Sequence, residues 1–170
     1  MKNSNLPWID TTIAEALTLQ PIRHASYNSQ RDMVLNFGKT VTGFYNDKTK
    51  QQHYLINDIT SNNYFDSNIY PALITWLPLK EGYKQDISIY DYDPSGKMGV
   101  IKASVINVSS GTYESTKSGI KDVWAVTVAD EIGKRKNDFM IYYIDKTDRT
   151  LWKQEINVVG RRMVLQRKES

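Results

Sequence analysis

The stretch DFMIYYIDKTDRTLWKQEINVVGRRMVLQRK, residues 138–168, contains three short apolar runs separated by two turn segments. The polar cluster Asp145–Thr150 follows the first run, and its Asp and Thr side chains can hydrogen-bond their own backbone, which favours a reversal of the chain. Beyond this turn, Trp152 and Ile156 alternate with charged residues such as Glu155. The pattern predicts a three-stranded meander with one buried face, which further strands must extend and another element must cover.

Length and composition are typical of a single mainly β domain. A chain of 170 residues is long enough to bury about two thirds of the surface that its unfolded form exposes. Eleven Tyr, four Trp and four Phe suit half-buried positions in a sheet. We therefore expect one β-barrel-like domain over residues 1–170 with a short N-terminal arm of about residues 1–10.

The charge and the cysteine count exclude several classes of partner and chemistry. The net charge of +3, from 22 basic and 19 acidic residues, is too small and too dispersed to predict a nucleic-acid partner. No cysteine is present, which excludes disulfides, thiol catalysis and thiolate metal sites. No apolar run approaches the roughly 18 residues that a transmembrane helix needs. The basic cluster near the C-terminus is interpreted as a solvated edge strand, with contact to phosphate or anionic lipid as the alternative: Arg161, Arg162, Arg167 and Lys168.

Alternating apolar residues predict about nine to eleven strands in total, arranged as a curved antiparallel sheet or an incomplete β-barrel. The clearest early strands cover residues 33–37, 41–45 and 52–56. Gly43 lies inside one of them, which indicates either a bulge or the close approach of another element.

The period changes to that of a helix between Asn68 and Leu77. There Ile69, Leu73, Trp76 and Leu77 recur at i, i+4, i+7 and i+8, so they share one helix face. We expect Asp66, Ser67 or Asn68 to cap this helix, and Pro78 to end it. Its apolar stripe, with Leu73 and Trp76 buried, is the expected cover of the sheet.

Motifs for catalysis, cofactors and metals are weak. His24 and His53 lie in separate predicted strands, and neither a G-x-S-x-G elbow nor a phosphate-binding glycine loop occurs, so the sequence predicts no enzyme, no catalytic residue and no cofactor. Residues 91–96 match the opening D-x-D-x-S-G of a calcium loop, but Lys102 stands where the bidentate glutamate belongs. We interpret this segment as a hairpin turn and expect no metal site.

Five aromatic residues are the candidate ligand-binding residues: Trp76, Tyr90, Trp124, Tyr143 and Trp152. Aromatic residues of this kind usually belong to a core. A curved sheet covered by one helix can also leave a concave apolar space, which a hydrophobic small molecule or a lipid would fill. The first hypothesis is therefore a non-enzymatic domain that binds an apolar ligand against the helix at residues 68–77. The alternative is a protein-interaction or scaffold module of the cell envelope, with a filled barrel and no small ligand, in which an open sheet edge or the arm around Trp8 makes the contact.

The segment NYFDSNIYPALITWLPLKEGY, followed by YYIDKTDRTLWKQEI and MVLQRK, resembles uncharacterised exported proteins of Bacteroidetes-type bacteria. Those proteins are similar to the lipoprotein-carrier (LolA/LolB-like) fold, an incomplete antiparallel barrel closed by a helix. The resemblance covers about residues 34–168, and its motifs at residues 77–79 and 153–155 are structural, so it supplies no active-site residue. It implies a periplasmic or otherwise extracytoplasmic location, with a signal peptide removed before this numbering begins, and a hydrophobic ligand.

Overall fold

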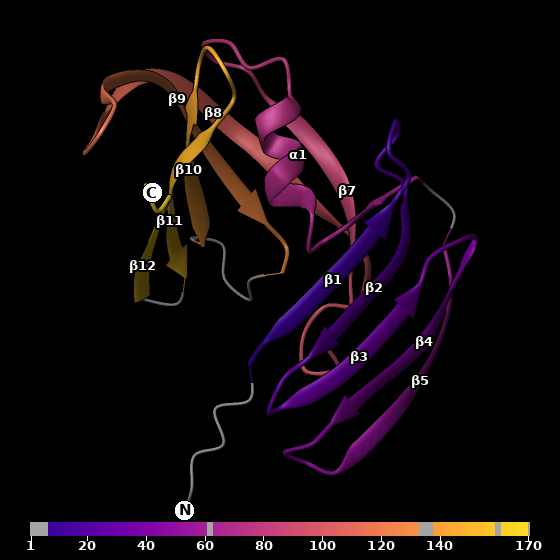
Figure 1. Ribbon diagram of the computed structural model, residues 1–170. Coiled ribbons are helices and arrows are strands. Elements are labelled where there is room, and N and C mark those ends of the chain that lie inside the picture. The colour runs from indigo at the N-terminus through magenta and orange to yellow at the C-terminus, as the bar shows by residue number, and fades with distance from the viewer. Residues whose placement is uncertain (1–6, 61–62, 133–137, 159–160, 170) are drawn as a thin grey trace, which may run out of the picture.

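The computed structural model describes residues 7–60, 63–132, 138–158 and 161–169, and this part of the chain forms twelve strands and one helix. The strands are divided between two sheets, and the helix lies against the second sheet (Figure 1). The first sheet has the order β1-β2-β3-β4-β5, and all its neighbours are antiparallel. Its strands are β1 (Ile9–Ala14), β2 (Pro21–Tyr27), β3 (Arg31–Asn36), β4 (Thr40–Asp47) and β5 (Gln52–Ile59).

The second sheet has the order β12-β11-β10-β9-β8-β7-β6. Its neighbours are antiparallel except for β6 and β7, which run parallel. Its strands are β6 (Phe65–Asp66), β7 (Gln85–Asp91), β8 (Gly99–Ser115), β9 (Gly119–Asp130), β10 (Phe139–Asp145), β11 (Leu151–Val158) and β12 (Arg161–Gln166). The last three strands confirm the meander predicted from the sequence.

The mainly β fold with one helix is confirmed, but the strands form two sheets and no closed barrel among the described residues. A barrel needs its terminal strands to pair, whereas β1 and β5 end the first sheet and β6 and β12 end the second. The strand count exceeds the expected range because the two residues of β6 are too few to show an alternation. Ile9 and Asp10, expected in the N-terminal arm, begin β1, and residues 1–6 lie outside the described part.

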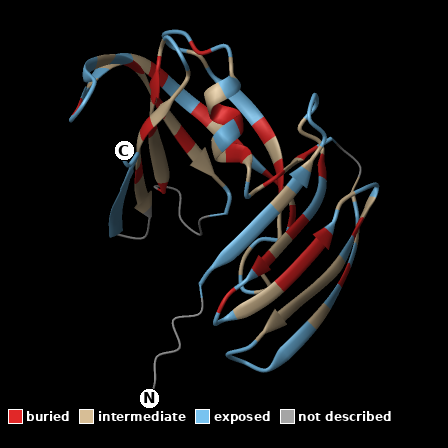
Figure 2. Ribbon diagram, viewed as in Figure 1, coloured by how far each residue is buried: buried red, intermediate tan, exposed pale blue. Residues whose placement is uncertain are grey.

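The helix α1 (Tyr70–Trp76) falls within the predicted range, but Trp76, which was expected to be buried, is exposed. Leu73 is buried as expected, together with Tyr70 and Ile74, whereas Trp76 is 65% exposed. Figure 2 shows that the helix carries both buried and exposed positions. The reason for the exposure of Trp76 is its position: Trp76 is the last residue of this seven-residue helix, and the backbone becomes extended at Leu77. No helix in the described ranges has the length and apolar character needed to cross a membrane.

The predicted side-chain cap of α1 is wrong. Ile69 is the N-cap residue, and no side chain caps the first turn. The Asp66 carboxylate instead accepts a hydrogen bond from the backbone N–H of Asn68 at 3.1 Å, before the helix begins. The hydroxyl of Tyr70 anchors the first turn by donating a hydrogen bond to Asp130 at the end of β9.

The first hydrophobic core lies between α1 and the second sheet. Ile74 of the helix and Ile89, Tyr142 and Ile144 of the sheet are all fully buried in it. In β10, Tyr142 and Ile144 point into this core, while Tyr143 between them is only half-buried. Side chains therefore fill the face of the sheet that the helix covers, and that face is not the open concave space considered from the sequence.

A second core joins the first sheet to β7. Met33, Leu35 and Ile56 of the first sheet are buried against Tyr64 and Tyr90. Of the two alternatives for Gly43 in β4, a bulge or a close approach, the structure shows the close approach: the pairing of β3 with β4 has no register shift at Gly43, and a Cβ there would lie 1.9 Å from the backbone oxygen of Val34 in β3.

Candidate ligand-binding groove

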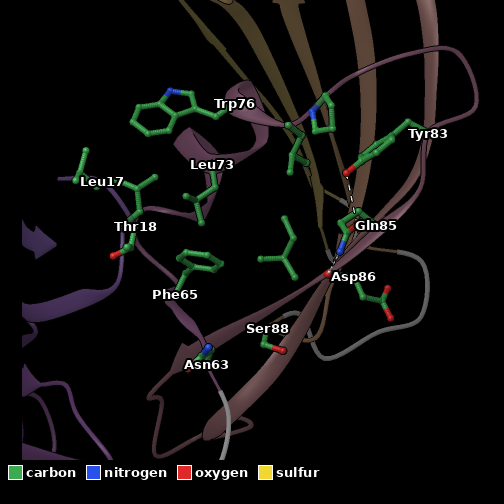
Figure 3. A pocket seen from close by; sticks show the side chains of 14 residues that line it. Leu17, Thr18, Asn63, Phe65, Leu73, Trp76, Tyr83, Gln85, Asp86 and Ser88 are labelled. Carbon is green, nitrogen blue, oxygen red and sulfur yellow. Dashed lines mark hydrogen bonds between the residues drawn. The ribbon is translucent and has the colours of Figure 1, made fainter. Parts of the chain in front are cut away.

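A groove of about 380 Å³ lies where the β1–β2 turn, α1 and β7 meet. Figure 3 shows Leu17 and Trp76 toward one side of this groove, Tyr83 and Gln85 toward the other, and Leu73 and Phe65 between them. Its apolar walls include Leu17, Leu19, Phe65, Leu73, Trp76 and Leu77. Its polar lining includes Asn63, Gln85, Asp86 and Ser88.

Two large apolar side chains of this groove are exposed to solvent. Leu17 at the tip of the β1–β2 turn is 96% exposed, and Trp76 at the end of α1 is 65% exposed. Neighbouring exposed apolar side chains beside a concavity mark binding surfaces more often than isolated ones do. The groove therefore has the composition of a site for an apolar ligand.

The backbone of the β1–β2 turn is held in a fixed shape. The N–H of Glu15 donates to the carbonyl of Gln20 at 2.9 Å, and the N–H of Leu19 donates to the carbonyl of Glu15 at 2.9 Å. Leu19 has a φ of 56°, a backbone conformation that residues other than glycine rarely adopt. This conformation places the half-buried Leu19 against the first core and in the groove wall.

One edge of β7 also lines the groove. Residues Gln85 to Ser88 are paired with β8 on one side, whereas β6 pairs only with Ile89 and Tyr90 on the other. The carbonyl of Asp86 accepts a hydrogen bond from the side-chain amide of Gln85 at 2.8 Å. The groove thus combines apolar side chains with the edge of a sheet.

Asp86 lies on the polar side of this edge. Its carboxylate accepts hydrogen bonds from the Ser104 hydroxyl at 2.7 Å and from the Lys102 ammonium at 3.1 Å. These two donors hold the pKa of Asp86 below its usual range, so the carboxylate stays charged.

A buried polar cluster lies close to the groove walls and joins the two sheets. His24 of β2 is 4% exposed, and its Nδ1 lies 3.1 Å from Oδ1 of Asp66 in β6. Thr12 of β1 donates to the other oxygen of Asp66 at 2.6 Å. On the far side of the ring, Nε2 of His24 lies 3.7 Å from Asp10 of β1. The cluster holds the β1–β2 hairpin, and with it Leu17, next to β6.

This cluster brings His24 next to two carboxylates, Asp66 and Asp10. Nε2 of His24 has no hydrogen-bond partner among the described residues. His53 lies on another strand, where its ring stacks on Phe44 with centroids 5.8 Å apart. Asp93 forms the predicted hairpin turn, since its carbonyl accepts the N–H of Gly96 at 2.9 Å. The described residues contain no group of three His, Asp or Glu side chains placed to hold a metal ion.

The structure does not bring the five predicted ligand-binding aromatics together. Trp76 lines the groove. Tyr90 is fully buried in the second core, where its ring centroid lies 5.9 Å from that of Phe37 and 5.6 Å from that of Tyr64. Trp124 is half-buried, with the ammonium of Lys146 lying 4.3 Å from its ring centroid.

The other two candidates lie on the outer side of the meander. The hydroxyl of Tyr143 donates to Glu155 at 3.2 Å. Trp152 donates from its indole N–H to Asp145 at 3.1 Å, stacks on Tyr113 and lines a separate pocket of about 270 Å³. Sequence reasoning missed Leu17 because an aliphatic side chain in a turn has no local pattern that indicates whether it lines a binding groove.

In its described residues the protein is mainly β, with two sheets, one helix and an apolar groove beside the helix. The family model described as "Protein of unknown function (DUF3108)" matches residues 1–166, so the chain belongs to that family. No curated protein and no solved structure matches the chain.

Proposed function

We propose that this protein binds an apolar ligand in the groove between the β1–β2 turn, α1 and β7, without changing it chemically. The observation that carries this proposal is the pair of exposed side chains, Leu17 and Trp76, beside a concavity with further apolar walls. The groove volume of about 380 Å³ lies within the range of about 300–1,000 Å³ that is typical of small-molecule sites.

The driving force would be the removal of apolar surface from water. Each buried methylene contributes about 0.8 kcal/mol, which corresponds to a roughly fourfold change in Kd. An acyl chain, the ligand class expected from the sequence, is the simplest molecule that would test this dependence. It would lie beside the helix rather than between helix and sheet, since buried side chains such as Ile74 and Tyr142 occupy that space.

The proposed setting is the periplasm or another extracytoplasmic compartment. This proposal rests on the resemblance of residues 34–168 to uncharacterised exported proteins, which are similar in turn to the lipoprotein-carrier fold. A hydrophobic ligand and a partner in the cell envelope are both consistent with a groove that lies open at the surface.

Calorimetric titration with straight-chain alcohols of increasing length tests the proposal. We expect affinity to rise with each methylene, and the variants Leu17→Ser and Trp76→Ala to weaken it by about tenfold or more each. Leu55→Ser is the matched control, because Leu55 is 81% exposed but lies on β5, outside the groove. Binding that is independent of chain length, or equally weakened by Leu55→Ser, would contradict the proposal.

A further inference from the structure

The edge of β7 in the groove is incomplete on one side. Every residue of β7 has a partner in β8, from Gln85 opposite Val105 to Asp91 opposite Gly99. On the other side, β6 pairs only with Ile89 and Tyr90 of β7. The edge of residues 85–88 therefore faces the groove without a partner strand in the described part of the chain.

The backbone groups on this open side belong to Asp86 and Ser88. The carbonyl of Tyr90 accepts the N–H of Ser67 at 3.1 Å, so the backbone polar groups of Tyr90 face the β6 side. Backbone groups of alternate residues in a strand point to the same side, which directs those of Ser88 and Asp86 to the open edge. The Gln85 side chain that donates to the Asp86 carbonyl at 2.8 Å occupies a position where a neighbouring strand would donate.

The two faces of the sheet differ in polarity along this edge. Ile87 is buried in the first core, next to the groove walls at Leu73 and Trp76. Asp86 and Ser88 point to the opposite face, where Asp86 contacts Lys102 and Ser104. A strand that added to this edge would therefore place alternate side chains in an apolar and in a polar environment.

We propose that the ligand of the groove is an extended peptide segment that pairs with the edge of β7 at residues 85–88. This inference rests on the proposed function and names the class of its ligand. The partner segment has alternating apolar and small polar residues: the apolar side chains enter the groove toward Trp76, and the polar ones face Asp86. A segment of about four residues, roughly 13 Å long, matches the open edge.

The edge favours a peptide over a bare hydrocarbon chain. A hydrocarbon chain can cover Leu73 and Trp76, but it offers no hydrogen bond to the backbone of Asp86 or Ser88. Because burying an unpaired backbone N–H costs free energy, a ligand that covers this edge binds more tightly when it supplies acceptors to it. A peptide supplies an acceptor and a donor at every second residue.

Amide hydrogen exchange measured by NMR tests the pairing directly. The probe is a capped synthetic peptide of alternating valine and serine, and its control is the same peptide with alternate amide nitrogens methylated. We expect the unmodified peptide to slow the exchange of the Asp86 and Ser88 amides at least tenfold, and the methylated peptide to bind at least tenfold more weakly. The amide of Ile87, which already faces β8, is an internal control and should not change.

A pair of variants at one position separates the backbone from the side chain. Asp86→Pro removes the backbone N–H on the open edge, and proline is tolerated in edge strands. Asp86→Ser keeps this N–H and removes only the carboxylate. We expect Asp86→Pro to reduce peptide affinity at least tenfold relative to Asp86→Ser. A native circular-dichroism spectrum and a cooperative urea transition in both variants show that each is folded, and equal peptide affinity in two folded variants would overturn the pairing.

The outcomes distinguish this inference from the proposed function. Binding of alcohols without any slowing of exchange by the peptide would overturn the strand pairing and leave the apolar groove in place. Binding of the peptide without protection of Asp86 and Ser88 would also overturn the pairing. Failure of both alcohols and peptide to bind would overturn the inference and the proposed function together.

Discussion

His24 on β2 lies 3.1 Å from Asp66 on β6, and this contact joins the first sheet to the second. Burial alone would lower the pKa of His24, but the hydrogen bond and charge of Asp66, together with Asp10, outweigh it and raise the pKa above its ordinary value. The protonated ring donates to Asp66 through Nδ1 and places its charge 3.7 Å from Asp10 on the Nε2 side, whereas the neutral ring carries no charge toward either carboxylate. The charge on His24 therefore stabilises the attachment of the β1–β2 hairpin.

The sign of the pH dependence follows from the raised pKa. The stabilisation from His24 is fully present below the unfolded pKa of about 6.5 and is lost as the pH rises through the higher pKa of the folded state. We expect the unfolding midpoint in urea to fall across this window in the native protein and to stay flat in His24→Gln. His53→Gln, at an exposed position on β5, should keep the native pH dependence. An identical slope in His24→Gln would contradict this assignment.

Gly43→Ala is predicted to destabilise the first sheet strongly. Gly43 has a φ of 151°, and a Cβ there would lie 1.9 Å from the backbone oxygen of Val34. The backbone strain alone costs about 1–3 kcal/mol, and the clash adds to it. Gly111→Ala is the control, because the nearest atom to its Cβ would be a Val123 methyl at 3.9 Å. Equal losses in the free energy of unfolding for the two variants would show that the close contact of β3 and β4 does not exist.

Tyr70→Phe is predicted to loosen α1. Burial raises the pKa of Tyr70, so its phenol keeps the proton that it donates to Asp130. Loss of a hydrogen bond to a charged group costs about 1.5–3 kcal/mol in the free energy of unfolding. Tyr83→Phe removes an exposed hydroxyl and should cost less than about 0.5 kcal/mol. Urea unfolding of both variants measures the difference, and a neutral Tyr70→Phe would count against the anchoring role.

Asp145→Ala is predicted to destabilise the turn between β10 and β11. The Asp145 carboxylate accepts the Trp152 indole N–H at 3.1 Å and the Thr147 backbone N–H at 2.8 Å. Without it these two donors lose their acceptor, which costs about 1–3 kcal/mol. Asp148→Ala is the matched control, since Asp148 is exposed and accepts one N–H from Thr150. Comparable losses in the two variants would show that Asp145 does no more than an ordinary turn residue.

Much of the local structure could be predicted from the sequence. The alternation and the polar cluster at residues 145–150 predicted β10, the turn and β11, because a turn and its flanking strands are specified by neighbouring residues. The helix was predicted from the spacing of Leu73 and its neighbours and from Pro78. Local patterns do not tell which face is covered, and both faces of β10 are apolar, so only the structure shows Tyr142 inside and Tyr143 outside.

The division into two sheets and the groove could not be predicted, since both depend on pairings between distant segments. The parallel pairing of Phe65 with Ile89 joins residues 24 positions apart and leaves no trace in the sequence around either. The five aromatic candidates were chosen for size, but burial separates Tyr90 from Trp76. The aliphatic Leu17 became a candidate only when the β1–β2 turn was seen beside α1.

The most direct test of the apolar groove is a set of intermolecular NOEs to a long-chain alcohol bound to the protein. Binding in the groove predicts NOEs from the methylene protons of the alcohol to the Trp76 indole, to the methyl groups of Leu17 and to those of Leu73. NOEs confined to other exposed apolar residues such as Leu55, or no NOEs at saturating alcohol, would contradict it.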